Sequence, residues 1–209
     1  MKTNQSLVVF LGPSYETVRA KTIVEASYWP PARRGDVERA ARSGAKTIVL
    51  IDGCMVHSLP PSPMEIYEVI RGGTTVVGAA SLGALRGVEL RYHGMTGSGW
   101  IYDRYLDGSI DSDDELVTLF DPRTGNPLTV PLVRIRYALS KLSEAGSVLE
   151  GQKVTLLRSL RSTYFEERTI SLIRSLAHKC DLRPNVIDEL FSPLFDIKAL
   201  DTIECLRTL

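Results

Sequence analysis

The sequence predicts an α/β fold, with a parallel sheet flanked by helices in the N-terminal part and a helical C-terminal region. Three observations predict it: short apolar runs that end in glycine or other small residues, stretches of helical length between them, and helical periodicity alone from Leu132 onward. Strands and helices that alternate with short connections favour parallel strands joined by right-handed crossovers.

Three apolar runs are the expected strands of this sheet. They lie at residues 7–11, 47–51 and 74–77. The first is apolar without interruption, as in a strand buried on both faces, and the other two begin with threonine. Proline and glycine punctuate the stretches between the strands, and Asp36 offers an N-cap for the second helix. The expected helices span residues 16–26, 37–43, 64–70 and 82–92.

The C-terminal part repeats apolar residues at helical spacing, which predicts several helices and no strand. The segment from Asp121 to Pro131 contains turn-forming residues and is the expected joint. We therefore expect residues 1–125 to form an α/β core that carries an active-site cleft. Residues 126–209 are expected to form a helical region packed on that core.

The composition argues against a nucleic-acid-binding, a disulfide-rich or a membrane-spanning protein. The 209 residues carry 25 basic and 25 acidic side chains, so the formal net charge is zero and a broad electrostatic grip on nucleic acid or anionic lipid is not expected. Three cysteines without a CxxC pair fit a reducing compartment. No apolar run approaches the length of a membrane span. We expect a soluble cytoplasmic protein.

Three chain segments follow the ends of the predicted strands: Gly12-Pro13-Ser14, Asp52-Gly53 and Ala80-Ser81. The carboxyl ends of parallel strands lie at one edge of a sheet, and ligands bind beyond that edge in open α/β folds. The sequence therefore predicts a working site built around Asp52 and Ser81.

Ser81 stands in the segment Gly78-Ala-Ala-Ser-Leu-Gly83-Ala-Leu-Arg86. Small residues on both sides of the serine allow a tight strand-to-helix turn resembling a nucleophile elbow, with Ala79 where that motif has glycine. Such a turn would expose the hydroxyl and direct the N–H groups of the next helix toward it, where they could bind an oxyanion or a phosphate. The alternative is a plain helix N-cap.

A serine nucleophile needs a proton acceptor. His57, five residues after Asp52, is the candidate; His93 lies beyond the next helix and His178 is more simply structural. Asp52 could orient the base, hold a water or bind a cation, or it could belong to an ordinary Asp-Gly turn. Cys54 and His57 could suggest a thiol nucleophile or half of a metal site, but no second pair completes one, so no metal is expected.

Other polar clusters have simpler interpretations. Ser112 and Glu115 match a capping box at the start of a helix. Arg86 and Glu89 stand three residues apart on the helix after Ser81 and are expected to pair. No Gly-rich nucleotide fingerprint follows a strand, which disfavours a nucleotide-binding domain, and no cofactor is expected.

Taken together, the motifs resemble TfuA-like proteins over roughly residues 7 to 137. Those not yet quoted are Pro30-Pro31-Ala-x-x-Gly35-Asp36, Arg86-x-x-Glu89-Leu90, Gly94-Met95-x-Gly97-x-Gly99-x-Ile101, Tyr105-x-Asp107-Gly108 and Asp113-Asp114-Glu115. The resemblance implies an accessory protein for a YcaO enzyme, which uses ATP to convert a peptide amide into a backbone thioamide. The modified chain would be methyl-coenzyme M reductase or a ribosomally made natural product.

The resemblance also implies that the protein hydrolyses a thiocarboxylate on a ThiS-like sulfur carrier, releasing sulfide beside YcaO, and that it promotes binding of the peptide substrate. The site of the family is hydrolase-like, with a serine and a lysine. The serine corresponds to Ser81. The lysine would precede Glu65-Ile66, where this chain has Met64.

Three alternatives follow from Met64: the lysine lies elsewhere, another base such as His57 replaces it, or hydrolysis is lost and partner binding is kept. In the enzymatic version Ser81 attacks the thiocarboxylate carbonyl or orients water, and Asp52 positions the nucleophile or the base. In the adaptor version the same rim binds the tail of the carrier while the helices dock YcaO. The residues expected at the rim and the oxyanion site are Gly12, Pro13, Ser14, Gly53, Leu82, Gly83 and Arg86.

Overall fold

The computed structural model describes residues 6–56, 58–121, 123 and 127–209. The chain divides into two compact units, Met1–Asp111 with Lys198–Leu209, and Ser112–Ile197. The sequence placed the division at residues 125/126. The partition seen here differs in that the chain enters the helical unit at residue 112 and returns to the first unit for its last twelve residues, which the helical pattern alone could not reveal.

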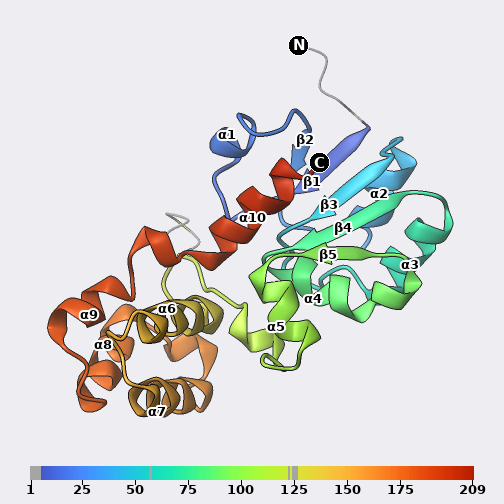
Figure 1. The fold of residues 1–209 in the computed structure, drawn as a ribbon. Coiled ribbons are helices and arrows are strands. Elements are labelled where there is room, and N and C mark those ends of the chain that lie inside the picture. Colours follow the sequence, from blue (N-terminus) through green and yellow to red (C-terminus); the bar gives the residue numbers. More distant parts are fainter. Residues whose placement is uncertain (1–5, 57, 122, 124–126) are drawn as a thin grey trace. The chain divides into compact units, whose positions relative to one another are not determined.

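The first unit is built on a parallel sheet, as the sequence predicted (Figure 1). In the described part of the chain the strand order is β2-β1-β3-β4-β5, and all neighbouring pairs are parallel. This is a doubly wound order in which the winding reverses between β1 and β3. The strands are β1 (Leu7–Phe10), β2 (Ser27–Trp29), β3 (Thr47–Leu50), β4 (Thr75–Ala79) and β5 (Thr96–Ser98).

Helices cover both faces of this sheet. One face packs on α2 and α3 through a core that includes Phe10, Ile48, Leu50 and Ile66. The opposite face packs on α1 and α10 through a core that includes Val9, Val49, Ala80 and Cys205. The helices of this unit are α1 (Thr17–Ala20), α2 (Asp36–Arg42), α3 (Pro63–Arg71), α4 (Leu82–Glu89), α5 (Trp100–Leu106) and α10 (Ile197–Arg207); a short 3-10 helix, η1, spans Arg91–His93.

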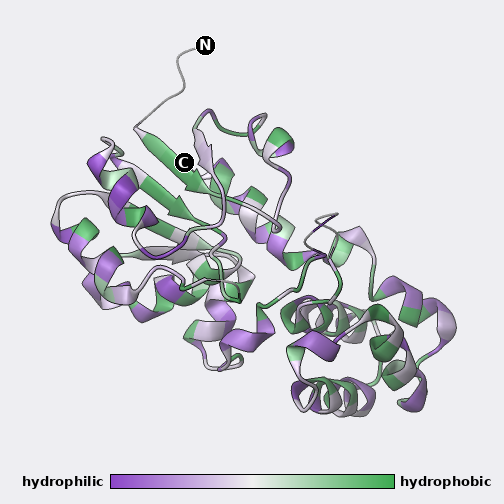
Figure 2. Cartoon of the chain, turned by 180° about the vertical axis from the view of Figure 1, so that it is seen from behind, coloured by the Kyte–Doolittle hydropathy of each residue, from purple (hydrophilic) through white to green (hydrophobic). Residues whose placement is uncertain are grey.

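The second unit is helical, as expected for this region. Its core is a single cluster of buried side chains, among them Leu132, Leu139, Leu156 and Ile173. Figure 2 shows the reason for both cores: the central strands are hydrophobic along their length, whereas the helices alternate between hydrophobic and hydrophilic residues. The elements of this unit are η2 (Asp113–Glu115), α6 (Leu132–Glu144), α7 (Glu150–Arg161), η3 (Phe165–Glu167), α8 (Ile170–Lys179), α9 (Pro184–Glu189) and η4 (Pro193–Phe195).

Several elements differ from the sequence prediction. The first helix is one turn long rather than eleven residues, and β2, β5 and α5 were not predicted. The N-cap of α2 is Gly35 in a left-handed conformation, and Asp36 is the first helical residue, whose side chain accepts a hydrogen bond from the Arg33 amide. β2 and β5 have three residues each, which is too short for a periodic signal. No helix in the described ranges is both long and apolar enough to cross a membrane.

Candidate functional site

The carboxyl ends of β1 and β3 meet at Asp52. One carboxylate oxygen, Oδ2, accepts hydrogen bonds from the Gly12 amide (2.9 Å) and the Ser14 amide (3.0 Å). The other, Oδ1, accepts one from the Ser14 hydroxyl (2.6 Å). Asp52 and Ser14 are both buried. The carboxylate therefore fixes the loop after β1, and the Ser14 amide, one of the expected oxyanion donors, is already engaged by Asp52.

The segment after β3 is joined to the chain that follows β2. Ala32 donates its N–H to the Asp52 carbonyl and accepts from the Cys54 amide, both at 2.9 Å, which forms a parallel bridge between Ala32 and Gly53. The Cys54 thiol lies 3.7 Å from the Pro31 carbonyl. These contacts bring the Pro30-Pro31-Ala32 stretch, one of the motifs of the family resemblance, to the rim.

Ser81 lies at the end of β4, where the strand turns into α4. The turn is strained at Ala80, which has φ +62°, and Ser81 follows with φ −99° and ψ −124°. The elbow is therefore present, but its left-handed residue is Ala80 rather than the serine. A non-glycine residue in this conformation costs on the order of 1–3 kcal/mol and persists only where the surroundings hold it.

The expectation of a prominently exposed Ser81 is wrong, because the residue is only 4% exposed. The plain N-cap alternative fails too: Ser81 occupies the N-cap position, but its side chain accepts no capping hydrogen bond. The hydroxyl makes no hydrogen bond to a described residue, and it is not among the fully enclosed polar atoms that lack a partner. Ser81 is therefore neither exposed as expected nor engaged as a helix cap.

The start of α4 lies against the end of β3. Gly83 donates its N–H to the Ile51 carbonyl (3.2 Å), next to Asp52 in the chain. A Cβ at Gly83 would lie 1.7 Å from the Leu50 carbonyl oxygen, so only glycine allows this approach. The Leu82 side chain covers Gly53, where a Cβ would lie 2.1 Å from Leu82 Cδ2. Asp52 and Ser81 therefore stand on adjacent strand ends, joined by the packing of α4.

Among the N–H groups at the start of α4, that of Gly83 is taken by the Ile51 carbonyl and that of Ala84 by the Ser81 carbonyl. The Leu82 amide is the first of the helix, a position without an intrahelical acceptor. No acceptor for it lies among the described residues. The oxyanion role of the Leu82 amide stays a prediction, while the Gly83 amide is engaged where α4 packs on the end of β3.

The other predicted site residues take different places. Pro13 is exposed at the rim. Arg86 pairs with Glu89 (2.6 Å), which confirms that prediction, and its Nε donates to the Pro61 carbonyl (3.0 Å). His57, the candidate base, lies outside the described residues. His93 is exposed and its ring stands against Tyr67 (5.4 Å between centroids); His178 is exposed in the helical unit.

Met64 lies in the first turn of α3. Its side chain is 64% exposed and lines a groove of about 560 Å³ between α2 and α3, together with Glu38, Ala41 and Glu68. None of the rim residues lines this groove. Among the described residues, no hydrogen bond joins Ser81 to a lysine or a histidine, and no group of three or more His, Cys, Asp or Glu side chains is placed to hold a metal ion.

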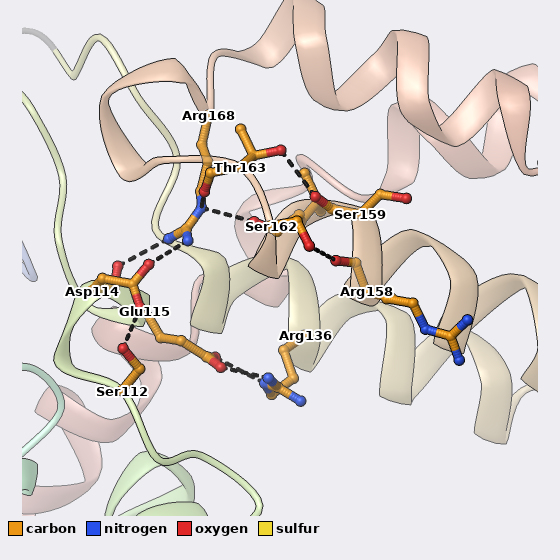
Figure 3. Close-up of polar contacts among 10 residues, drawn as sticks. Ser112, Asp114, Glu115, Arg136, Arg158, Ser159, Ser162, Thr163 and Arg168 are labelled. Carbon is orange, nitrogen blue, oxygen red and sulfur yellow. Dashed lines mark hydrogen bonds and ion pairs between the residues drawn. The ribbon is translucent and has the colours of Figure 1, made fainter.

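The acidic run after residue 111 is not a capping box. The Ser112 side chain donates to Asp114 rather than capping η2. Figure 3 shows where the carboxylates point: the buried Glu115 makes a two-bonded ion pair with Arg136, and Asp114 pairs with the buried Arg168. These pairs lie within the helical unit and hold its first segment to α6 and to the chain after α7. Sequence spacing missed them because both arginines are more than twenty residues away.

Asp201 was also missed. It lies on α10, is 2% exposed, and accepts hydrogen bonds from the Trp100 and Ile101 amides at the start of α5, each at 2.9 Å. Burial raises the pKa of Asp201 to about 7, which these two hydrogen bonds offset only in part. A contact a hundred residues apart leaves no local signal in one sequence.

Comparison with known proteins gives one match. The family model of the TfuA-like protein covers residues 52–169, which is more than half of the chain. It begins at Asp52 and includes the Ser81 turn and the Glu115–Arg136 and Asp114–Arg168 pairs. A comparison with curated proteins finds no match. The geometry of the rim and this match agree with the sequence motifs, and the chain belongs to the TfuA-like family.

Proposed function

We propose that this protein hydrolyses the C-terminal thiocarboxylate of a ThiS-like sulfur carrier and supplies the sulfide to a YcaO enzyme for peptide backbone thioamidation. One observation carries the proposal: a serine hydroxyl that forms no structural hydrogen bond to a described residue follows a strained residue at a strand-to-helix turn, beside an unengaged helix amide. Strain kept at such a turn is typical of functional sites. Membership of the TfuA-like family supports the partners.

In the proposed reaction the Ser81 oxygen attacks the thiocarboxylate carbon, and its proton passes to a base. The Leu82 N–H stabilises the negative charge that develops on the carbonyl oxygen. The protonated base gives that proton to the sulfur as the carbon–sulfur bond breaks, so that hydrosulfide leaves and Ser81 holds the carrier as an ester. Water then hydrolyses the ester and returns a carboxylate. His57 is the base proposed from the sequence. No metal or nucleotide takes part in these steps, and ATP belongs to YcaO.

Asp52 has a positioning role in this proposal. Its three hydrogen bonds to Gly12 and Ser14 shape the loop beside the turn, and its carboxylate oxygens are occupied by them. We therefore assign it to the architecture of the rim rather than to proton transfer.

The test is sulfide release from a thiocarboxylated ThiS-like carrier. Ser81→Ala is expected to lower the rate by about a thousandfold or more. Ser43→Ala is the control, since Ser43 is an exposed serine at the end of α2 whose hydroxyl donates to the Ala40 carbonyl, away from the rim. Release that survives in Ser81→Ala would reject the hydrolase.

A non-catalytic adaptor is the second candidate, and the position of Met64 favours it. An exposed methionine in the α2–α3 groove stands where the family resemblance implies the lysine of a Ser–Lys pair. An adaptor would bind the carrier tail at the rim and dock YcaO elsewhere. In that case Ser81→Ala would leave YcaO-dependent thioamidation, measured by mass spectrometry with inorganic sulfide supplied, and carrier binding both unchanged, and the wild-type protein would release no sulfide.

A further inference from the structure

Arg86 connects α4 to the chain that precedes α3. Its Nε donates to the Pro61 carbonyl at 3.0 Å, and its Nη1 pairs with Glu89 at 2.6 Å. The Arg86 side chain is 12% exposed and that of Glu89 is 38% exposed. A guanidinium with two fixed partners and little water around it is a rigid link, because its planar group donates hydrogen bonds to both partners in fixed directions.

The same face of α4 contacts two parts of the segment after β3. Leu82 and Arg86 stand four residues apart and therefore on one face of the helix. Leu82 covers Gly53 at the start of the segment, and Arg86 holds Pro61 near its end. The helix that begins at the Ser81 turn thus contacts the segment near both of its ends.

Few other bonds hold the far end of this segment. Within the described ranges, the hydrogen bonds to residues 59–61 are the one from Arg86 and one from the Arg34 amide to the Leu59 carbonyl, at 2.8 Å. Three prolines at positions 60, 61 and 63 remove backbone donors there. The contact with Arg86 is therefore a large share of what fixes this stretch relative to α4.

We infer that Arg86 is a positioning residue: it fixes residues 59–61 as a wall beside the Ser81 turn, against which the tail of the substrate lies. The sequence placed Arg86 among the rim residues that bind substrate, whereas here its guanidinium is engaged by Pro61 and Glu89. The inference rests on the proposed function and names a determinant of substrate binding for that site. The backbone donor of Leu82 does not depend on Arg86, so loss of Arg86 loosens binding more than it slows chemistry.

The experiment measures KM and kcat for sulfide release from a thiocarboxylated ThiS-like carrier. Arg86→Gln is expected to raise KM about tenfold and to change kcat less than about threefold. Arg86→Lys keeps the positive charge but not the planar fork, and its KM is expected to fall between those of the wild type and Arg86→Gln. The matched control is Arg19→Gln, which removes an arginine paired with Glu16 three residues away and 68% exposed on α1.

Hydrogen exchange gives a readout that does not need activity. The Arg34 amide, which donates to the Leu59 carbonyl, and the Leu59 amide are expected to exchange faster in Arg86→Gln than in the wild type and Arg19→Gln. A merely structural role would lower apparent kcat in proportion to the folded fraction and leave KM unchanged, and that result would overturn the inference. Unchanged exchange at Arg34 and Leu59 would overturn it too. If the wild type releases no sulfide, the proposed function fails, whereas an active wild type with an unchanged KM in Arg86→Gln rejects this inference alone.

Discussion

Ser14 and Ser81 stand on loops that follow strands β1 and β4, on either side of β3, and the fold uses them differently. The hydroxyl and the amide of Ser14 both donate to Asp52, in a buried cluster where every carboxylate oxygen is engaged. Ser81 follows the strained Ala80 and gives its hydroxyl to no described residue. Ser14 therefore stabilises the rim, whereas Ser81 leaves its hydroxyl without a described partner next to a strained backbone residue.

The turn that carries Ser81 depends on Gly83, which lets α4 approach the end of β3. Gly83→Ala would place a Cβ 1.7 Å from the Leu50 carbonyl oxygen, which is backbone and cannot turn away. We expect a loss of about 3 kcal/mol or more in the free energy of unfolding. Urea unfolding followed by tryptophan fluorescence measures it, because Trp29 and Trp100 both lie in the first unit.

The control is Gly151→Ala in α7, where an added Cβ meets nothing within 4 Å. There the substitution is expected to stabilise by about 0.5–1 kcal/mol, because alanine favours the helix. Its unfolding is followed by far-UV circular dichroism, since both tryptophans lie in the other unit. Equal effects at the two glycines would show that α4 does not need its close approach to β3.

The loop that carries Ser14 depends on its hydrogen bonds to Asp52. Asp52→Ala leaves the Gly12 amide, the Ser14 amide and the Ser14 hydroxyl without their acceptor in a buried place. We expect a loss of about 2–3 kcal/mol in the free energy of unfolding, measured by the same urea titration. Ser14→Ala removes one of the three bonds and is expected to cost about 1 kcal/mol. If Asp52→Ala were as stable as the wild type, the carboxylate would not hold the loop, and a direct chemical role for Asp52 would regain support.

Asp201 lies on α10, whose Cys205 and Leu206 belong to the same core cluster as Ala79 and Ala80. Burial raises its pKa to about 7, and Glu204 and Asp103 add to the rise. The folded state therefore binds the proton more tightly than the unfolded state, whose aspartate titrates near 3.9. This contribution to stability is complete below about pH 4 and is lost as the pH rises through 7.

Between pH 5 and pH 8 the wild type should lose roughly 2 kcal/mol more stability than Asp201→Asn, which cannot ionise. Unfolding by urea at several pH values, followed by tryptophan fluorescence, measures the difference. Parallel pH profiles for the two proteins would contradict the assignment.

The sequence predicted the sheet because its central strands are continuous apolar runs, and it predicted the rim because residues at parallel strand ends share an edge. It could not predict that Ala80, rather than Ser81, adopts the left-handed conformation, because both are small and neither is glycine. Nor could it show that Asp52 is engaged by Ser14, since bonds across 38 residues have no local signature. The short strands β2 and β5 were missed because three residues carry no periodic signal, and the return of the chain as α10 because contacts between distant segments have no local signature.

The substitution with the smallest expected effect on stability tests the contrast between Ser14 and Ser81 most directly. Ser81→Ala removes a hydroxyl that makes no hydrogen bond to a described residue, so the free energy of unfolding should change by about 0.5 kcal/mol or less. Ser14→Ala is the natural reference, because the two substitutions delete the same atom from two buried serines on the same sheet. Urea unfolding of both variants measures the contrast. A loss in Ser81→Ala as large as that in Ser14→Ala would mean that the Ser81 hydroxyl has a structural partner, and the strain at Ala80 would then serve packing instead of chemistry.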